Sequence, residues 1–272
     1  MLHPGPTHTP FKVHALPLPS RRALRRGGIV LIVLAVFLVG LARGTSIDLW
    51  LADRMFDAAT GRFDWRDHWF AVDVMHRWVK IPLILLGASI VGAALADGVR
   101  PLTILSTNDR LRLRMAAACA LLVPLVVAFV KHYASPHCPW DVDRYGGVAP
   151  YLRLFDALPA AVPAGHCFPA GHASSALWLT GLCVWLLPHR PRAAAGVGVL
   201  GMSLGFGLGW VQQLRGAHFL THTLASAWIA AAVLWAVFVV VAALHDPRAK
   251  AVATAQGSAD YEPFVPITPR RI

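Results

Sequence analysis

Two histidines follow glycine-containing turns and lie near basic residues in the sequence. One ends the run Pro169-Ala-Gly-His172, and the other ends Arg215-Gly-Ala-His218. Imidazole can act as a nucleophile or a general acid near neutral pH, and Lys or Arg side chains can hold phosphoryl oxygens. If the fold brings His172 and His218 together with Lys131 and Arg215, these side chains suit chemistry on a phosphate group.

The elements that must position these residues are apolar segments of membrane-spanning length. The 272 residues are 56% hydrophobic and 14% charged, whereas soluble domains carry about 25% charged residues. This excludes a disordered chain and argues against an ordinary water-soluble enzyme. A bilayer core needs about 20 apolar residues per helix. We expect an all-α polytopic membrane protein with six spans, at residues 28–43, 79–96, 113–131, 173–188, 193–210 and 222–244.

The distribution of basic residues predicts the orientation of these spans. With the N-terminus inside, four segments become cytoplasmic: 1–27, 97–114, 189–192 and 245–272. Together they hold 15 of the 25 Lys and Arg residues but 5 of the 14 acidic ones, as expected for cytoplasmic loops. The net charge of +11 therefore reports orientation and not binding to nucleic acid. We expect both termini in the cytoplasm and the loops 131–172 and 211–222 on the outer side of the membrane.

The ends of the chain differ in composition from its core. Residues 1–27 are rich in Pro and Arg, and residues 245–272 follow the last span, so we expect two disordered cytoplasmic tails around a domain of residues 28–244. The outer segment 45–78 carries four tryptophans. Its residues 63–78 could form an amphipathic helix at the membrane interface, and the tryptophans are typical of an aromatic belt.

A glycine pattern in the fifth expected span has a structural explanation. Gly196, Gly198 and Gly201 match the dinucleotide fingerprint G-x-G-x-x-G, but they lack the preceding strand and the acidic residue of that motif. Gly201, Gly205 and Gly209 recur at every fourth residue. This spacing favours close packing of membrane helices.

These residues alone leave the function open between phosphate chemistry and a non-catalytic membrane protein. A single His or Lys at a membrane border is usually an interfacial polar group, and the chain holds 13 histidines. The alternatives are a transporter and a bundle that binds haem or quinone. Haem ligation would need histidines facing each other within spans, whereas these histidines lie at span ends.

Three short motifs occur in register with the expected spans. They are Lys131 followed by Cys138-Pro139, then Pro169-Ala-Gly-His172, then Gly216-Ala-His218 ahead of Thr221. In order and separation they resemble the motifs of the type 2 phosphatidic acid phosphatase superfamily. The runs Cys138-Pro-Trp-Asp141 and Arg215-Gly-Ala-His-Phe219 resemble those of a divergent bacterial branch of it. The resemblance covers about residues 28–244.

The resemblance implies a metal-independent phosphatase that needs no cofactor and acts through a phosphohistidine intermediate. His218 matches the nucleophile, and His172 matches the general acid that protonates the leaving oxygen. Lys131 matches the first phosphate-binding cation. Arg215 and Gly171 are the further residues that we expect to bind the phosphate.

The chain departs from the family pattern in all three motifs. The departures are Cys138 for Arg in the first motif, Ala170 for Ser in the second, and Gln212 for Arg and His222 for Asp in the third. Arg215 is the nearest replacement for the missing Arg, and Arg144 and Asp141 could compensate from the first outer loop. A neutral His222 can fix the tautomer of His218 but can hardly stabilise its imidazolium.

The four cysteines fall into two groups. Cys119 and Cys183 lie inside spans and are expected to be buried core residues. Cys138 and Cys167 share one outer loop, where an oxidising periplasm permits disulfides. We predict a bridge between Cys138 and Cys167, which would tie the first motif to the second.

A metal site formed by His137, Cys138, His166 and Cys167 is the competing interpretation of this loop. Adjacent His-Cys pairs lack the usual spacing of metal ligands, so we expect no metal.

The function that the resemblance implies is hydrolysis of a lipid phosphate or diphosphate at the periplasmic face of a bacterial inner membrane. The expected partners are the phosphorylated lipid and the surrounding membrane lipids. The resemblance suggests polyprenyl diphosphate, phosphatidylglycerol phosphate, phosphatidic acid or lipid A as candidates. The alternatives are a lipid phosphotransferase, which differs only in the acceptor, and a non-catalytic member that binds or transports a lipid.

Overall fold

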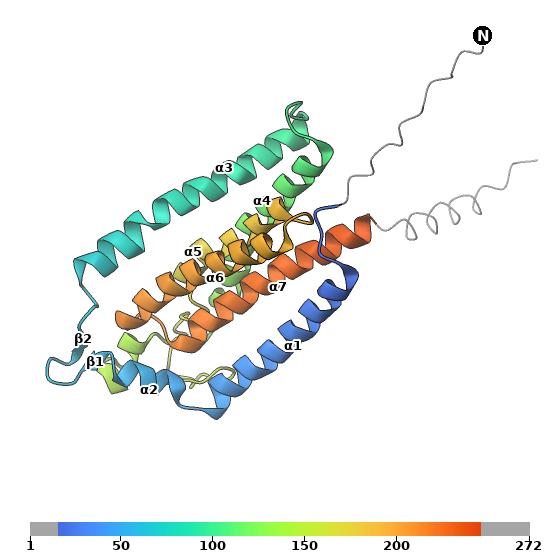
Figure 1. The fold of residues 1–272 in the computed structure, drawn as a ribbon. Coiled ribbons are helices and arrows are strands. Elements are labelled where there is room, and N and C mark those ends of the chain that lie inside the picture. Colours follow the sequence, from blue (N-terminus) through green and yellow to red (C-terminus); the bar gives the residue numbers. More distant parts are fainter. Residues whose placement is uncertain (1–15, 246–272) are drawn as a thin grey trace, which may run out of the picture.

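The computed structural model describes residues 16–245, which form a helical bundle with one small antiparallel hairpin (Figure 1). The long helices are α1 (Arg21–Gly44), α3 (Lys80–Val99), α4 (Thr107–His132), α6 (Pro191–Leu214) and α7 (Leu220–Leu244). The shorter elements are α2 (Ile47–Asp53), β1 (Phe56–Asp57), β2 (Arg62–Phe63), the π-helix η1 (Phe70–Trp78), the 3₁₀ turns η2 (Pro139–Asp141) and η3 (Asp143–Tyr145), α5 (Gly171–Leu177) and the 3₁₀ helix η4 (Trp178–Leu186). The segments α4 to α7 pack together, while α1 lies against α7 and α3 against α4 (Figure 1).

Helices of membrane-spanning length dominate the described part of the chain. Within residues 16–245, five helices are long and apolar enough to cross a membrane: α1, the continuous helix Phe70–Val99, α4, α6 and α7. The outer face of α1 is apolar and exposed, since Ile32, Val36 and Phe37 each expose more than 60% of their surface. Water-soluble proteins rarely expose continuous apolar faces of this size. The helices therefore indicate a membrane protein.

The fourth expected span, 173–188, does not form one long helix. It is divided into α5 and η4, which together run from Gly171 to Leu186 and lie in the middle of the bundle between α4, α6 and α7. Much of the segment is buried, including Ala173, Leu177 and Val184, whereas Trp185 is exposed. This segment is shorter than the other helices because Pro188 follows it and ends the regular backbone.

The glycine stripe of α6 faces its neighbours, as the sequence predicts. A Cβ atom on Gly201 would lie 2.6 Å from the Thr180 backbone nitrogen, and a Cβ on Gly205 would lie 2.4 Å from the Leu177 side chain. A Cβ on Gly209 would lie 2.3 Å from the Thr223 side chain of α7. Glycine is therefore required for α6 to approach α5, η4 and α7 this closely. The two buried free cysteines, Cys119 and Cys183, belong to the same core.

The first outer segment does not form the amphipathic helix that residues 63–78 could have made. The chain makes the β1–β2 hairpin and a turn first, and the helix begins only at Phe70 and continues into α3. The helix starts late because Phe63 belongs to the hairpin, where its buried ring packs against Phe56 and Tyr145. Three tryptophans of this segment, Trp50, Trp69 and Trp78, expose half of their surface or more.

The helix α1 begins inside the segment that we expected to be a disordered tail. Ser20 caps it by accepting a hydrogen bond from the Ala23 backbone nitrogen, and such a cap stabilises a helix start. The rest of the two expected tails, residues 1–15 and 246–272, lies outside the described residues.

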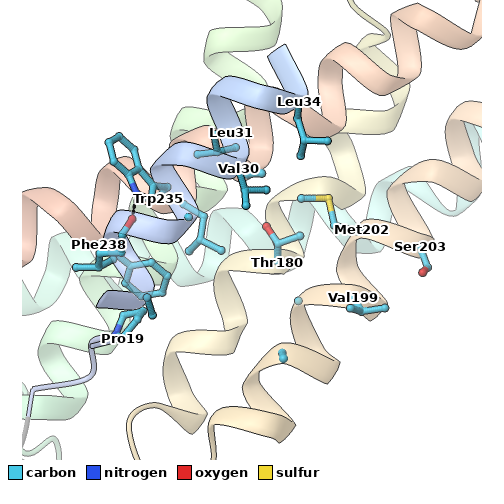
Figure 2. Close-up of a pocket in the computed structure, with 17 residues that line it drawn as sticks. Pro19, Val30, Leu31, Leu34, Thr180, Val199, Met202, Ser203, Trp235 and Phe238 are labelled. Carbon is cyan, nitrogen blue, oxygen red and sulfur yellow. Dashed lines mark hydrogen bonds between the residues drawn. The ribbon is translucent and has the colours of Figure 1, made fainter. Parts of the chain in front are cut away.

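An apolar groove of about 580 Å³ separates α1 from α6 along α7 (Figure 2). Leu31, Val199 and Met202 line it, and Trp235 at one edge donates a hydrogen bond to the Leu24 carbonyl. These residues belong to the first half of α1 and α6 and to the second half of α7. The groove therefore lies far along the bundle from the histidines, which stand at the opposite end of α7.

Replacing Gly201 with Ala should destabilise the bundle, whereas the same change at Gly196 should not. The new methyl group at position 201 meets backbone of η4 and overpacking costs about 1–3 kcal/mol, while Gly196 has open space around it. At Gly196 the better helix propensity of Ala should leave stability unchanged or raise it by up to about 1 kcal/mol. Thermal unfolding in detergent measures both variants, and equal midpoints would contradict this packing.

Candidate active site

The nucleophile candidate His218 lies in the short connection between α6 and α7. Gly216 makes this turn possible, because its φ is +74° and a Cβ there would lie 2.3 Å from the Phe63 ring. The Gly216 carbonyl accepts a hydrogen bond from the Trp140 backbone nitrogen (3.0 Å), which joins this turn to the first-motif loop. His218 is consequently fixed at the junction and is only 4% exposed.

The acid candidate His172 begins α5, and the start of α5 is tied to the start of α7. The Ala170 backbone nitrogen donates to the His222 carbonyl (3.0 Å), and the Ser226 hydroxyl donates to the Ala170 carbonyl (2.9 Å). These bonds hold both helix starts at one level of the bundle. As a result the rings of His172 and His218 lie 6.0 Å apart, centroid to centroid.

The two cation candidates flank this pair. Lys131, near the end of α4, is partly buried, and its side chain passes so close to Gly171 that a Cβ there would lie 4.0 Å from Lys131 Cδ. Arg215 is 9% exposed and donates from Nε to the Arg66 carbonyl (3.1 Å). Lys131 and Arg215 are both close enough to act electrostatically on His172, the residue after Gly171.

Gln212 has a defined partner in this structure. It stands where the family has Arg, and its Oε1 accepts a hydrogen bond from Arg215 Nη1 (2.9 Å). Both side chains are buried. The amide therefore holds the guanidinium that the neighbouring turn supplies.

His222 is the third histidine of the group, one turn into α7. Its ring lies 5.8 Å from that of His218 and is enclosed by Phe168 and Phe219. Its Nδ1 is buried and makes no hydrogen bond within the described residues.

Sequence reasoning missed Asp48 of α2, which accepts hydrogen bonds from the backbone nitrogen and hydroxyl of Thr221 (2.9 and 2.5 Å) and caps α7.

The supporting roles expected of Arg144 and Asp141 stay predictions, and the structure shows where the two residues lie. Arg144 makes a two-pronged ion pair with Asp53 of α2, with both nitrogen–oxygen distances 2.8 Å, and Tyr145 donates to the same carboxylate (2.8 Å). Asp141 is exposed, and its backbone carbonyl accepts bonds within its own loop. Arg144 is thus engaged with α2 in this structure.

Cys138 and Cys167 form a disulfide in the structure, as the sequence analysis expects, with 5.3 Å between their Cα atoms. The Cys167 sulfur lies 3.4 Å from His218 Nδ1. A disulfide sulfur carries no hydrogen, so in this contact only the imidazole can donate. The bridge therefore places the proton of a neutral His218 on Nδ1 and leaves Nε2 free.

The competing metal site is not assembled. The two sulfur atoms are bonded to each other, so neither is a thiolate ligand. His137 Nε2 lies 3.0 Å from the Pro163 carbonyl, and His166 Nδ1 lies 3.3 Å from the Lys131 carbonyl. Each imidazole is thus engaged with backbone.

Sequence reasoning also missed His76, which η1 brings to the site. Its ring lies 4.1 Å from that of His172, and its Nδ1 lies 3.4 Å from Arg215 Nη1. Lys80, one helical turn later, adds positive charge near His76 and His172. No sequence signal singles out His76, because its segment has the composition of an ordinary interfacial helix.

Alkylation of the denatured protein should label Cys119 and Cys183 but not Cys138 or Cys167 until a reductant is added. Peptide mass spectrometry identifies the labelled cysteines, and four labelled thiols without reductant would contradict the bridge.

Since the cysteines are 29 residues apart, the chain-entropy treatment gives a loss of about 3–4 kcal/mol of folding stability on reduction. Cys167→Ser should lower the unfolding midpoint for the same reason.

Stability should fall as the pH drops below about 6.5, the ordinary pKa of His. Burial holds the pKa of His218 well below that value, and nearby His222 and Lys131 lower it further. The unfolded chain therefore binds a proton that the folded chain excludes, which costs up to about 1.4 kcal/mol per pH unit. Unfolding measured from pH 7.5 to pH 5 should show a weaker pH dependence in His218→Gln than in the wild type or in exposed His68→Gln. Equal slopes in all three proteins would refute the neutral buried state.

Comparison with known proteins agrees with this geometry. A family model of the PAP2 superfamily matches residues 112–246, a range that runs from α4 to the end of α7 and includes Lys131, His172 and His218. No curated protein and no solved structure matched the chain. Members of the superfamily are phosphatases that act on phosphate esters. The chain therefore belongs to the PAP2 superfamily of type 2 phosphatidic acid phosphatases.

Proposed function

We propose that this chain is an integral membrane enzyme that hydrolyses a lipid phosphate or diphosphate through a phosphohistidine on His218. The observation that carries the proposal is the pairing of His172 and His218, whose rings lie 6.0 Å apart, with Lys131 and Arg215 beside them. Two imidazoles and two cations provide a nucleophile, an acid and charge for the phosphoryl oxygens.

The location of the site at one end of the bundle supports a lipid substrate. Helices α4 and α6 end there and α5 and α7 begin there, so the histidines stand at the level expected for the headgroup of a lipid whose chains lie in the bilayer. The excess of Lys and Arg in the opposite loops supports placing this end on the periplasmic side of a bacterial inner membrane. On this proposal, residues 28–244 form the catalytic domain and both termini are cytoplasmic.

The proposal retains six spans, with α5 and η4 as the fourth. The seven residues of α5 and nine of η4 rise about 28 Å at the usual α-helical and 3₁₀ spacings. This is close to the bilayer core of about 30 Å. Its central place between α4, α6 and α7 agrees with the burial of Ala173, Leu177 and Val184.

The proposed reaction needs a neutral His218 and a protonated His172, the charged form that the anionic phosphate of a bound substrate favours. His218 is neutral, with its proton on Nδ1 toward the disulfide, so Nε2 attacks phosphorus while the bond to the ester or bridging oxygen breaks. His172 gives its proton to that oxygen, and the dephosphorylated lipid leaves. Neutral His172 then takes a proton from water as the water oxygen attacks phosphorus, the N–P bond breaks and phosphate departs. Lys131 and Arg215 hold the phosphoryl oxygens in both steps.

His218→Ala should abolish phosphate release, because the proposed reaction forms its bond to phosphorus from His218 Nε2. The assay measures phosphate released in detergent from phosphatidic acid, phosphatidylglycerol phosphate, polyprenyl diphosphate and lipid A. Exposed His68→Ala is the control and should keep wild-type activity. Phosphate release by His218→Ala at the wild-type rate would refute the assignment of His218 as the nucleophile.

A trapped intermediate distinguishes histidine from other nucleophiles. Brief reaction with a radiolabelled lipid phosphate should label the wild type with phosphate that acid removes and alkali does not, as expected of phosphohistidine. His218→Ala should remain unlabelled.

A further inference from the structure

We propose that His76 of η1 is a positioning residue of this phosphatase site. Its side chain contacts Arg215 on one side and His172 on the other, and holds both in place. The inference rests on the proposed function and extends it to a helix outside the range matched by the family. It comes from the contacts of His76 on its two sides.

On one side, His76 holds the guanidinium of Arg215. Arg215 Nη1 lies 2.9 Å from Gln212 Oε1 and 3.4 Å from His76 Nδ1. A guanidinium is always protonated and has no acceptor, so Nδ1 must be the acceptor in this contact. The ring proton of neutral His76 is therefore on Nε2, and its tautomer is set by Arg215.

On the other side, the ring of His76 packs on His172. The centroids lie 4.1 Å apart at an interplanar angle of 37°. His172 Nδ1 is buried and makes no hydrogen bond within residues 16–245. Packing against His76 thus supplies a restraint on the His172 ring that hydrogen bonds do not.

The local backbone agrees with a specific role for this position. Residues Phe70–Trp78 are π-helical, with Val79 N bonded to the Val74 carbonyl, and such turns occur frequently at functional sites. His68, just before this helix, provides the comparison: it is exposed and stacks on Trp65 and Trp69, as an ordinary interfacial histidine does. His76 is the one of the two that touches Arg215 and His172.

The loss of His76 should therefore misplace both the cation and the acid. Misplacement by about 1 Å can cost about 100-fold in rate, so we expect His76→Ala to lower kcat/KM by about 10- to 100-fold, with kcat affected. His76→Asn keeps an acceptor near the position of Nδ1 and should recover part of the activity. His76→Phe keeps only the ring contact and should recover less.

A double-mutant cycle tests the connection to Arg215. If His76 acts through Arg215, His76→Ala should reduce kcat/KM far less in an Arg215→Ala background than in the wild type, because coupled residues are non-additive. A merely structural role would give additive losses and no advantage of Asn over Phe. Unfolding midpoints are measured for every variant, and His68→Ala serves as the matched control with wild-type activity expected.

The outcomes separate this proposal from the function on which it rests. Wild-type turnover that His218→Ala abolishes, together with His76→Ala activity within about twofold of wild type, overturns the role of His76 alone. Additive losses of kcat/KM in the double-mutant cycle also overturn the role of His76 alone. If His76→Ala fails to fold, the activities of the other two variants decide. Higher activity of His76→Asn than of His76→Phe supports the role of His76, and equal activities overturn it. Absence of turnover by the wild type with every phosphorylated lipid overturns both proposals.

Discussion

The hydrogen bonds between the start of α5 and the start of α7 are the contact on which the rest of the site depends. The Ala170 backbone nitrogen donates to the His222 carbonyl across this junction, and the Ser226 hydroxyl donates to the Ala170 carbonyl. Polar groups enclosed in an apolar bundle must find partners inside the protein. Because these groups satisfy one another, the two helix starts are fixed at one level. His172 and His218 face each other as a consequence.

The departures from the family motifs are linked through the same junction. Cys138, in place of an arginine, is bonded to Cys167, and that bridge contacts His218. Gln212, in place of another arginine, accepts a hydrogen bond from Arg215. Each of these two lost arginines is thus accompanied by another contact at the site.

Part of this arrangement was predictable because it depends on local patterns. The apolar segments predict the long helices, and the spacing of Gly201, Gly205 and Gly209 predicts the close approach of α6 to its neighbours. The fourth span was predicted less well, since hydropathy does not reveal that the segment is central and divides into α5 and η4. The expected helix over 63–78 begins later for a related reason: burial of Phe63 depends on partners far along the chain.

The sequence by itself determined that this chain is helical, apolar and equipped with histidines and cations at helix ends, since composition, period and motif spacing are local properties. Only the tertiary structure decided which of these groups meet. Arg144 binds Asp53 and Asp48 caps α7, although the partners are 91 and 173 residues apart, and His76 approaches Arg215 from 139 residues away. Such contacts arise when packed helices bring distant turns to one end of the bundle. No spacing within a single segment encodes them.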